Sequence, residues 1–394
     1  MKILAIHNFH RKGSASGDDQ VFNHETALLE ANGHQVIRYS TINDSFDRAG
    51  AFGKLKAAFG MLWSFKHYRQ VKKLIRAEKP DVVHIHTFFP LLSPSVLYAA
   101  KKHCGKVVAT LHDTRFICPC ATSLRGTTLC NQCGDGKYFR MAKHRCFKNS
   151  KLQSILVAGI FKVHRWLGSF RKKIDRYICL NDNQIRLLTE IGFDQKKIVK
   201  KYNFVAQANV ADAPLTEDLP DRYCVFYGRI GAEKGIHILQ KIWEKLKDIP
   251  LVVMGGGPLE DEFRVWAQQH PQVRFLGYTE HSKCLQIVRG GEFVVFPSIW
   301  YEGCSMVEIE TESLGKALVA TDLGFSQEAI QEGYNGCKIP LGDVDGFVRT
   351  ITRLWQDPAL CREMGENARR DYECKYMPAD NYRQLIAVYE SVQP

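Results

Sequence analysis

The feature that most constrains the fold is a repeated alternation of short apolar runs with longer amphipathic stretches. The runs Lys2–His7, Gln35–Tyr39, Asp81–His86, Lys106–Leu111 and Asp175–Leu180 are typical of buried strands. Helical stretches separate these runs, including a basic amphipathic segment over residues 54–78 that ends before Pro80. Strands and helices in this order predict βα units and a mostly parallel sheet, with Asn181 as a helix cap.

The alternation stops over residues 200–220, which are polar, irregular and contain proline, as a linker does. It then starts again, with strands expected at Tyr223–Tyr227, Leu251–Met254, Val273–Phe275, Glu292–Phe296 and Ala317–Ala320. A chain of 394 residues is too long for one ordinary core. We therefore expect an α/β protein with two domains, 1–205 and 206–376, and a C-terminal helix in 377–394 that packs on the first domain.

The net charge of +12 is concentrated in the first half, where the segments Lys54–Arg76 and Arg140–Arg176 are strongly basic. A basic surface favours anionic partners, such as membrane lipids, lipid diphosphates or nucleic acid, and a solvated basic face is the alternative. Nucleic acid is not expected as a partner. The start MKILAIHNF is unlike a signal peptide, and no apolar run reaches the length of a membrane span. We expect a cytoplasmic protein, either free or peripheral on the inner face of the cell membrane.

Three loops that follow strands of the second half suit a nucleotide diphosphate, because parallel sheets bind ligands at the carboxyl ends of their strands. Arg229 and Lys234 flank a glycine turn before a helix, and Gly255–Gly257 follow another strand. Glu302 and Glu310 lie on either side of a small-residue turn whose amides open a helix. Taken singly, each loop could equally be a surface loop, a tight turn or an acidic helix face.

Together these loops make the second half resemble the nucleotide-binding domain of family 4 retaining glycosyltransferases, which have the GT-B fold. The resemblance is carried by YGRIGAEKG (227–235), VVMGGGP (252–258), FLGY (275–278) and WYEGCSMVEIETESLGKALVATDLG (300–324). The spacing of the two glutamates is the signature of that family. The resemblance covers nearly the whole chain and implies two Rossmann-like domains with a donor and acceptor cleft between them.

The resemblance also implies roles for single residues. Arg229 and Lys234 would hold the donor diphosphate, Glu302 would lie by the sugar, and Glu310 would bind the ribose hydroxyls. The sugar or phosphate would contact the amides of Gly303, Cys304, Ser305 and Met306, and the base would face the backbone of Gly277 and Tyr278. Many members have Phe and Pro or Gly at the positions of Cys304 and Ser305, which leaves sugar specificity open.

The first half resembles the same family at two points. Gly17 lies in a loop, Ser14–Asp19, that is similar to the glycine-containing loop after the first strand of the family. His112 follows a strand and corresponds to a histidine beside the transferring sugar. The alternative for His112 is a histidine satisfied by a backbone carbonyl at a strand end, and His84 and His86 are weaker candidates.

A cysteine-rich insertion occupies about residues 114–150. Cys118, Cys130, Cys133 and Cys146 could hold a structural zinc ion, because Cys130 and Cys133 have the spacing of a metal knuckle. Unligated thiols and a redox role are the alternatives, and Cys120 and His144 are spare candidates for ligands. Four protein ligands would leave no open position, and the resemblance requires no metal for transfer, so a catalytic metal is not expected.

The expected activity is that of a retaining hexosyltransferase. It would move a hexose from a UDP- or GDP-sugar to a glycan or a lipid-diphosphate-linked glycan, as in cell-surface polysaccharide biosynthesis. In the family the donor phosphate is thought to accept the proton of the acceptor, so neither glutamate needs to be a general base. The alternatives are a sugar-nucleotide epimerase or a phosphorylase of the same fold, and a nucleic-acid-binding zinc protein.

Overall fold

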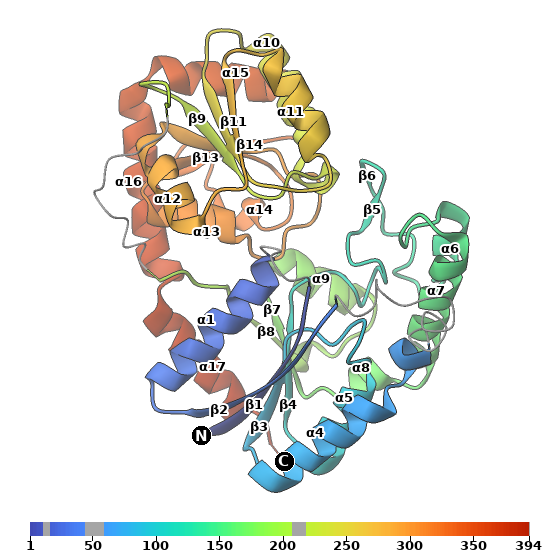
Figure 1. The fold of residues 1–394 in the computed structure, drawn as a ribbon. Coiled ribbons are helices and arrows are strands. Elements are labelled where there is room, and N and C mark those ends of the chain that lie inside the picture. The colour runs from blue at the N-terminus through green and yellow to red at the C-terminus, as the bar shows by residue number, and fades with distance from the viewer. Residues whose placement is uncertain (11–15, 44–58, 207–217, 394) are drawn as a thin grey trace. The chain divides into compact units, whose positions relative to one another are not determined.

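The computed structural model describes residues 1–10, 16–43, 59–206 and 218–393 (Figure 1). Two compact units account for these residues, and each contains a six-stranded parallel sheet with helices on its faces. The first unit consists of residues 1–125, 130–202 and 381–394, and the second of residues 126–129 and 203–380. The expectation of two Rossmann-like α/β domains is therefore confirmed. The divisions fall at 202/203 and 380/381, where the sequence had indicated 205/206 and 376/377.

The sheet of the first unit has the strand order β2-β1-β3-β4-β7-β8. Its strands are β1 (Lys2–Phe9), β2 (Gln35–Ile42), β3 (Val82–Ile85), β4 (Val107–Leu111), β7 (Arg176–Cys179) and β8 (Ile198–Lys200). Its helices are α1 (Gly17–Ala31), α4 (Phe65–Glu78), α5 (Ser95–His103), α6 (Arg140–His144), α7 (Lys151–Trp166), α8 (Ser169–Lys172) and α9 (Asp182–Glu190). A small sheet of β5 (Leu124–Arg125) and β6 (Thr128–Leu129) lies within the cysteine-rich segment.

The last helix, α17 (Pro378–Glu390), belongs to the first unit from Asn381 onward. Tyr389 Oη lies 2.8 Å from His84 Nδ1, and Arg176 Nη2 donates to the Ser391 carbonyl at 2.9 Å. The chain thus returns to its first sheet after completing the second one.

The second sheet has the order β11-β10-β9-β12-β13-β14. Its strands are β9 (Cys224–Tyr227), β10 (Leu251–Met254), β11 (Val273–Gly277), β12 (Phe293–Phe296), β13 (Ala317–Thr321) and β14 (Gly336–Ile339). Its helices are η2 (Ala232–Lys234), α10 (Ile236–Lys245), α11 (Glu260–Gln268), α12 (His281–Gly290), α13 (Met306–Ser313), α14 (Ser326–Ala329), α15 (Val344–Gln356) and α16 (Pro358–Lys375). Since β11, β10, β9 and β12 are neighbours, the loops that follow them stand side by side at one edge.

Several expectations need correction or fall outside the described residues. The continuous helix over residues 54–78 is wrong, because Ser64 interrupts it and caps α4 by accepting a hydrogen bond from the His67 amide at 3.3 Å. Residues 54–58, the linker residues 207–217, and Ser14 and Ala15 of the glycine loop lie outside the described residues. The cap at Asn181 is confirmed, since its side chain accepts from the Gln184 amide at 2.7 Å.

In the part of the chain that the structure describes, no helix combines the length and the apolar character needed to cross a bilayer.

Candidate active site

Glycines hold the loops after β9, β10 and β12 tightly together. Gly235 has a φ of 72°, and a Cβ added there would lie 1.9 Å from the Pro297 carbonyl oxygen. A Cβ at Gly255, whose φ is 136°, would lie 1.8 Å from the Gly228 oxygen. These glycines therefore allow one loop backbone to pack on another, and the hypothesis that Gly255–Gly257 admit a ligand gains no support from Gly255.

A buried ion pair joins two of these loops. Lys234 Nζ lies 2.6 Å from Glu302 Oε1, and the two side chains are only 15% and 7% exposed. Ser298 Oγ donates to the same carboxylate oxygen at 2.8 Å. The Lys234 ammonium also lies 5.3 Å from the centre of the Phe296 ring, a cation–π distance. The sequence placed Lys234 and Glu302 in one site, and the structure brings them into direct contact.

Arg229, the second cation expected at the diphosphate, has a different environment. Its side chain is 59% exposed, and its Nε lies 3.4 Å from Glu233 Oε1. An exposed pair of this kind contributes little to stability, so the guanidinium can turn toward a ligand at small cost. The Lys234 side chain is thus held in place by its contacts, whereas the Arg229 side chain is free to change its conformation when a ligand binds.

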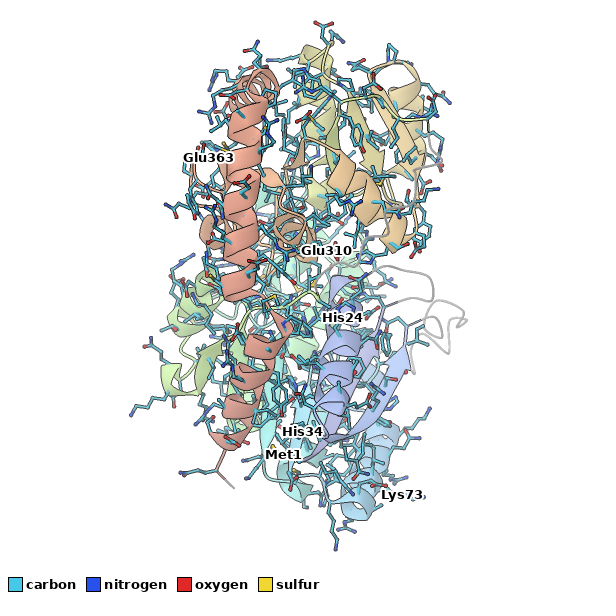
Figure 2. The ribbon with its side chains drawn as sticks, turned by 90° about the vertical axis from the view of Figure 1, so that its left-hand side faces the viewer. Met1, His24, His34, Lys73, Glu310 and Glu363 are labelled. Atoms are coloured by element: carbon cyan, nitrogen blue, oxygen red, sulfur yellow. The ribbon has the colours of Figure 1, made fainter. Side chains whose placement is uncertain are left out.

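Glu310 lies on the second turn of α13 and is buried. Its Oε1 lies 2.8 Å from His281 Nε2 at the start of α12. This hydrogen bond raises the pKa of His281 above its ordinary value, against an opposing effect of burial. Burial raises the pKa of Tyr227 well above its usual range, and the nearby Glu310 charge adds to this effect. The carboxylate of Glu310 is therefore held between α12 and β9, and Figure 2 labels it on the ribbon.

Glu308 lies between the two signature glutamates in sequence and is completely buried. Ser326 Oγ donates to its Oε1 at 2.6 Å. Burial, which outweighs that hydrogen bond, raises its pKa to about 8. Glu308 is therefore protonated at neutral pH, a property that the acidic sequence of this helix did not reveal.

The turn before α13 is held by Asn203, a residue outside the sequence motifs. Asn203 Nδ2 donates to the Cys304 carbonyl at 2.8 Å, and the Asn203 amide lies 3.3 Å from Cys304 Sγ. Ser305 is the N-cap of α13, with no side-chain hydrogen bond that caps the helix. The amides expected to contact the donor, those of Gly303 to Met306, therefore lie in this turn and in the first residue of the helix.

Gly277 and Tyr278, expected near the base, are the last residue of β11 and the residue that follows it. Gly277 has a φ of 69° and its carbonyl accepts from the Gly255 amide at 2.8 Å. Tyr278 is 71% exposed. An exposed aromatic ring at the same sheet edge is available for a planar ligand.

In the first unit the candidate residues gather at the carboxyl ends of β1, β3 and β4. His112 Nε2 lies 3.0 Å from His86 Nδ1, and the two rings are stacked. Burial lowers the pKa of His112 to about 4, although the nearby Asp18 charge opposes this shift. Gly17 is the first residue of α1, so its amide is among those that a helix leaves unpaired. The structure thus brings His86 into contact with His112, although the sequence favours His112 over His86 as a site residue.

The five cysteines of the insertion influence one another. A hydrogen bond from Cys120 lowers the pKa of Cys118 to about 6, while burial and neighbouring thiols raise that of Cys133 to about 12. Among the described residues, clusters of three or more metal-ligating atoms within 4.8 Å occur at two places, and neither includes a cysteine. The thiols are therefore near neighbours but do not form a closed ligand set, and zinc stays a prediction.

Two family models match the two halves of the chain in turn. Residues 21–207 match the model described as Glycosyltransferase Family 4, and residues 209–371 match the model described as Glycosyl transferases group 1. Together they cover every strand of the two sheets except β1, and every candidate residue except Gly17.

Among curated proteins, O-antigen chain mannosyltransferase C of Escherichia coli is 34% identical over 164 residues, which cover 40% of this chain and 43% of the relative. Phosphatidyl-myo-inositol mannosyltransferase of Mycolicibacterium smegmatis is 27% identical over 339 residues, covering 82% and 75%. The crystal structure of Anabaena HepE in complex with UDP-glucose covers 100% of both chains with a TM-score of 0.68 and 16% identity. At that identity, the last comparison establishes the fold alone.

Proposed function

The chain is a glycosyltransferase with the GT-B fold, and we propose that it moves a hexose from a nucleotide-sugar donor to a glycan acceptor with retention of configuration. The observation that carries the donor assignment is the buried pair of Lys234 and Glu302 on the same sheet edge as Glu310. A cation for the diphosphate and one carboxylate for hydroxyl groups thus lie on neighbouring loops, and a second carboxylate lies on the helix that follows, α13. A UDP- or GDP-sugar has all three kinds of group.

In this proposal each side chain has a separate task. Glu310 accepts hydrogen bonds from the ribose hydroxyls, and Glu302 accepts them from the sugar. Lys234, Arg229 and the amides before α13 stabilise the charge that develops on the leaving diphosphate. The ammonium of Lys234 has three donors, so it can keep its contact with Glu302 while it binds a phosphate oxygen.

The bond changes balance without a protein base. The bond between the anomeric carbon and the donor phosphate oxygen breaks, and a bond to the acceptor oxygen forms on the same face. The acceptor proton passes to the departing phosphate oxygen, and His112 contacts the transferring sugar. Catalysis then consists mainly of positioning and of charge stabilisation.

We further propose that the acceptor is a glycan linked to a lipid, and that the first unit docks on an anionic membrane surface in the cytoplasm. Support comes from α7, where Leu152 and Trp166 are 77% and 82% exposed. Together with Ile155 and Val163 they recur at helical spacing along one face. No carboxylate occurs between Asp135 and Asp175, so the charged residues near this apolar stripe in sequence are all basic. Such a face suits the headgroup region of a bilayer.

Product analysis tests the proposed reaction against other chemistry on this fold. The protein is incubated with UDP- and GDP-hexoses labelled in the sugar, together with a membrane lipid extract. Label transferred to the lipid fraction, with release of nucleoside diphosphate, supports the proposal. Label that stays on the nucleotide as an epimer, or that appears as sugar phosphate when inorganic phosphate is added, refutes it.

A further inference from the structure

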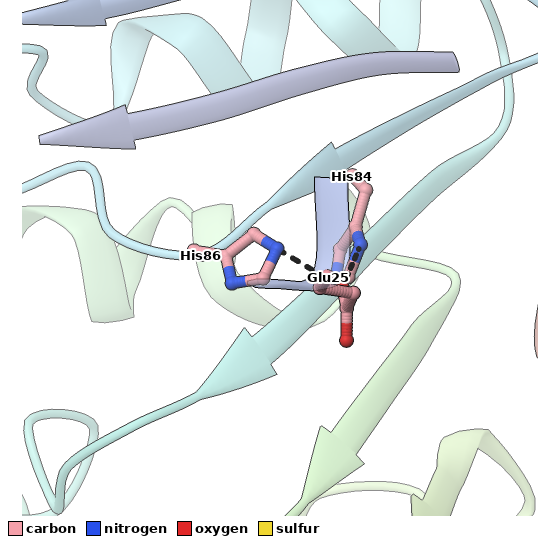
Figure 3. A group of neighbouring side chains, drawn as sticks. All are labelled: Glu25, His84 and His86. Atoms are coloured by element: carbon pink, nitrogen blue, oxygen red, sulfur yellow. Dashed lines mark ion pairs between the residues drawn. The ribbon is translucent and has the colours of Figure 1, made fainter. Parts of the chain in front are cut away.

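A buried glutamate, Glu25, is linked to His112 through His86 in the first unit. Glu25, on α1, is 1% exposed, and its Oε1 lies 3.1 Å from His84 Nδ1 and 3.2 Å from His86 Nε2 (Figure 3). The three residues come from α1 and from the end of β3. Neither Glu25 nor Lys201 belongs to the sequence motifs.

A metal ion is one possible occupant of this cluster, but the chain supplies its own cation. Lys201 Nζ lies 3.0 Å from Glu25 Oε2, and both side chains are 1% exposed. The same ammonium donates to Asn381 Oδ1 at 2.9 Å. The Lys201 ammonium already neutralises the Glu25 carboxylate. A divalent cation bound beside it would be repelled by the ammonium, with no further negative charge among the described residues of the cluster to offset that repulsion. The cluster is therefore interpreted as a hydrogen-bonded network.

The ionisation of Glu25 fixes where the proton of His86 lies. Burial opposes ionisation, but the Lys201 charge and the close contacts with the two histidines outweigh it and hold the pKa of Glu25 well below its usual range. Burial holds the pKa of His86 well below its ordinary value, so this ring carries one proton at neutral pH. A lone pair on Nε2 facing the carboxylate would be repelled, so the proton lies on Nε2.

The 3.2 Å contact between Glu25 Oε1 and His86 Nε2 lacks standard hydrogen-bond geometry, and both atoms are buried. Neither Glu25 Oε1 nor His86 Nε2 has a hydrogen-bond partner of standard geometry in the part of the chain that the structure describes, so this contact is where His86 Nε2 can place a proton. Leaving a buried donor and a buried acceptor unsatisfied is costly, so each atom depends on the other.

The position of this proton decides the next contact. With its proton on Nε2, His86 has a lone pair on Nδ1, which lies 3.0 Å from His112 Nε2. That nitrogen must then be the donor. His112 has only one proton at neutral pH, so its Nδ1 becomes an acceptor.

We propose that Glu25 is a positioning residue that, through His86, holds His112 with its proton on Nε2 and its lone pair on Nδ1. This inference rests on the proposed role of His112 beside the sugar. A neutral acceptor at this point suits a hydroxyl group of the transferring hexose, which would donate to Nδ1. Glu25 thus acts on the reaction without touching the substrate.

The test is the tautomer of His112, measured by nitrogen NMR of protein labelled with ¹⁵N-histidine, without substrate. His112→Gln identifies the signals of the residue. We expect wild-type His112 to show an unprotonated Nδ1 and a protonated Nε2 at neutral pH. In Glu25→Gln the donor-only Lys201 takes the amide oxygen, so the amide NH₂ faces His86 and the tautomers of both rings reverse.

The matched control is Glu30→Gln, which removes a carboxylate from the same helix, where Glu30 pairs with Arg38 at the surface. It leaves the His112 tautomer unchanged. A wild-type His112 with its proton on Nδ1 overturns the proposal, even if Glu25→Gln fails to fold. A folded Glu25→Gln variant with unchanged His112 signals overturns it as well. Because no substrate is present, neither result depends on the proposed transferase activity, which the product analysis tests separately.

Discussion

Lys234 Nζ lies 2.6 Å from Glu302 Oε1, with both side chains largely buried. Removing the cation leaves a buried carboxylate without its counter-charge, which costs about 3 kcal/mol for such pairs. We expect Lys234→Met to lower the unfolding temperature of the free protein and also to weaken binding of UDP or GDP at least tenfold.

Lys245→Met is the control for this experiment. Lys245 Nζ lies 2.6 Å from Asp345 Oδ1, but both side chains are more than half exposed. An exposed pair contributes about 0–1 kcal/mol, so thermal unfolding and nucleotide binding should barely change. Equal nucleotide affinity of the two variants would show that Lys234 does not bind the donor.

The buried Glu308 predicts a pH dependence of stability. Its pKa is raised to about 8, so between the unfolded value of 4.5 and about 8 the folded state holds a proton that the unfolded state releases. This contribution to stability therefore falls as the pH rises, by at most about 1.4 kcal/mol per pH unit. We expect the stability of Glu308→Gln to fall less steeply with rising pH than that of the wild type.

The measurement is urea unfolding at about pH 5.5 and about pH 7.5, with the exposed Glu363→Gln as control. The stability of Glu308→Gln relative to wild type should increase between the two pH values, whereas that of the control should stay constant. A constant difference for Glu308→Gln as well would mean that Glu308 is ionised in the folded protein.

The exposed stripe on α7 predicts binding to membranes. In sedimentation with anionic vesicles we expect wild-type protein to bind, and to be released by high salt because part of the attraction is electrostatic. Trp166→Glu puts a charge into the stripe and should reduce the bound fraction severalfold. Val265→Glu adds the same charge at an exposed apolar position of α11 and should bind as wild type does. If the bound fraction depends neither on the charge of the lipid nor on the Trp166→Glu substitution, the proposed membrane-docking face is refuted.

Metal analysis tests the cysteine-rich insertion. We expect about one zinc ion per purified chain, and its loss in the double variant Cys130→Ser/Cys133→Ser. Cys374→Ser, which alters an exposed cysteine of α16, should keep the metal. A wild-type chain that contains no zinc and takes up none when zinc is added would favour unligated thiols.

The alternation of strands and helices was sufficient to predict both sheets, because a parallel strand is buried on both faces and stands out as an apolar run. Two peripheral strands, β8 and β14, were not predicted, since edge strands are short and mixed in composition. The break at Ser64 was missed because one capping serine can interrupt an otherwise continuous helical pattern.

The site was predictable where a motif lies on one loop and not where distant segments meet. Lys234 and Glu302 could be assigned together from their motifs. Glu25 and Lys201 meet across 176 positions of sequence, and the polar contact is invisible until the fold is known. The state of Glu308 was hidden for a similar reason, since its burial, and not its residue type, sets its pKa.

The central claim is that the second unit binds a nucleotide-sugar donor through Glu310. The most direct measurement is calorimetric titration of the wild type, Glu310→Ala and Glu363→Ala with UDP and GDP; Figure 2 labels both glutamates. We expect the wild type and Glu363→Ala to bind one of the nucleotides equally. Glu310→Ala should bind it tenfold to a hundredfold more weakly, as loss of charge-assisted hydrogen bonds of about 1.5–3 kcal/mol requires. Equal affinity of Glu310→Ala and wild type, or no binding of either nucleotide to the wild type, would contradict the account.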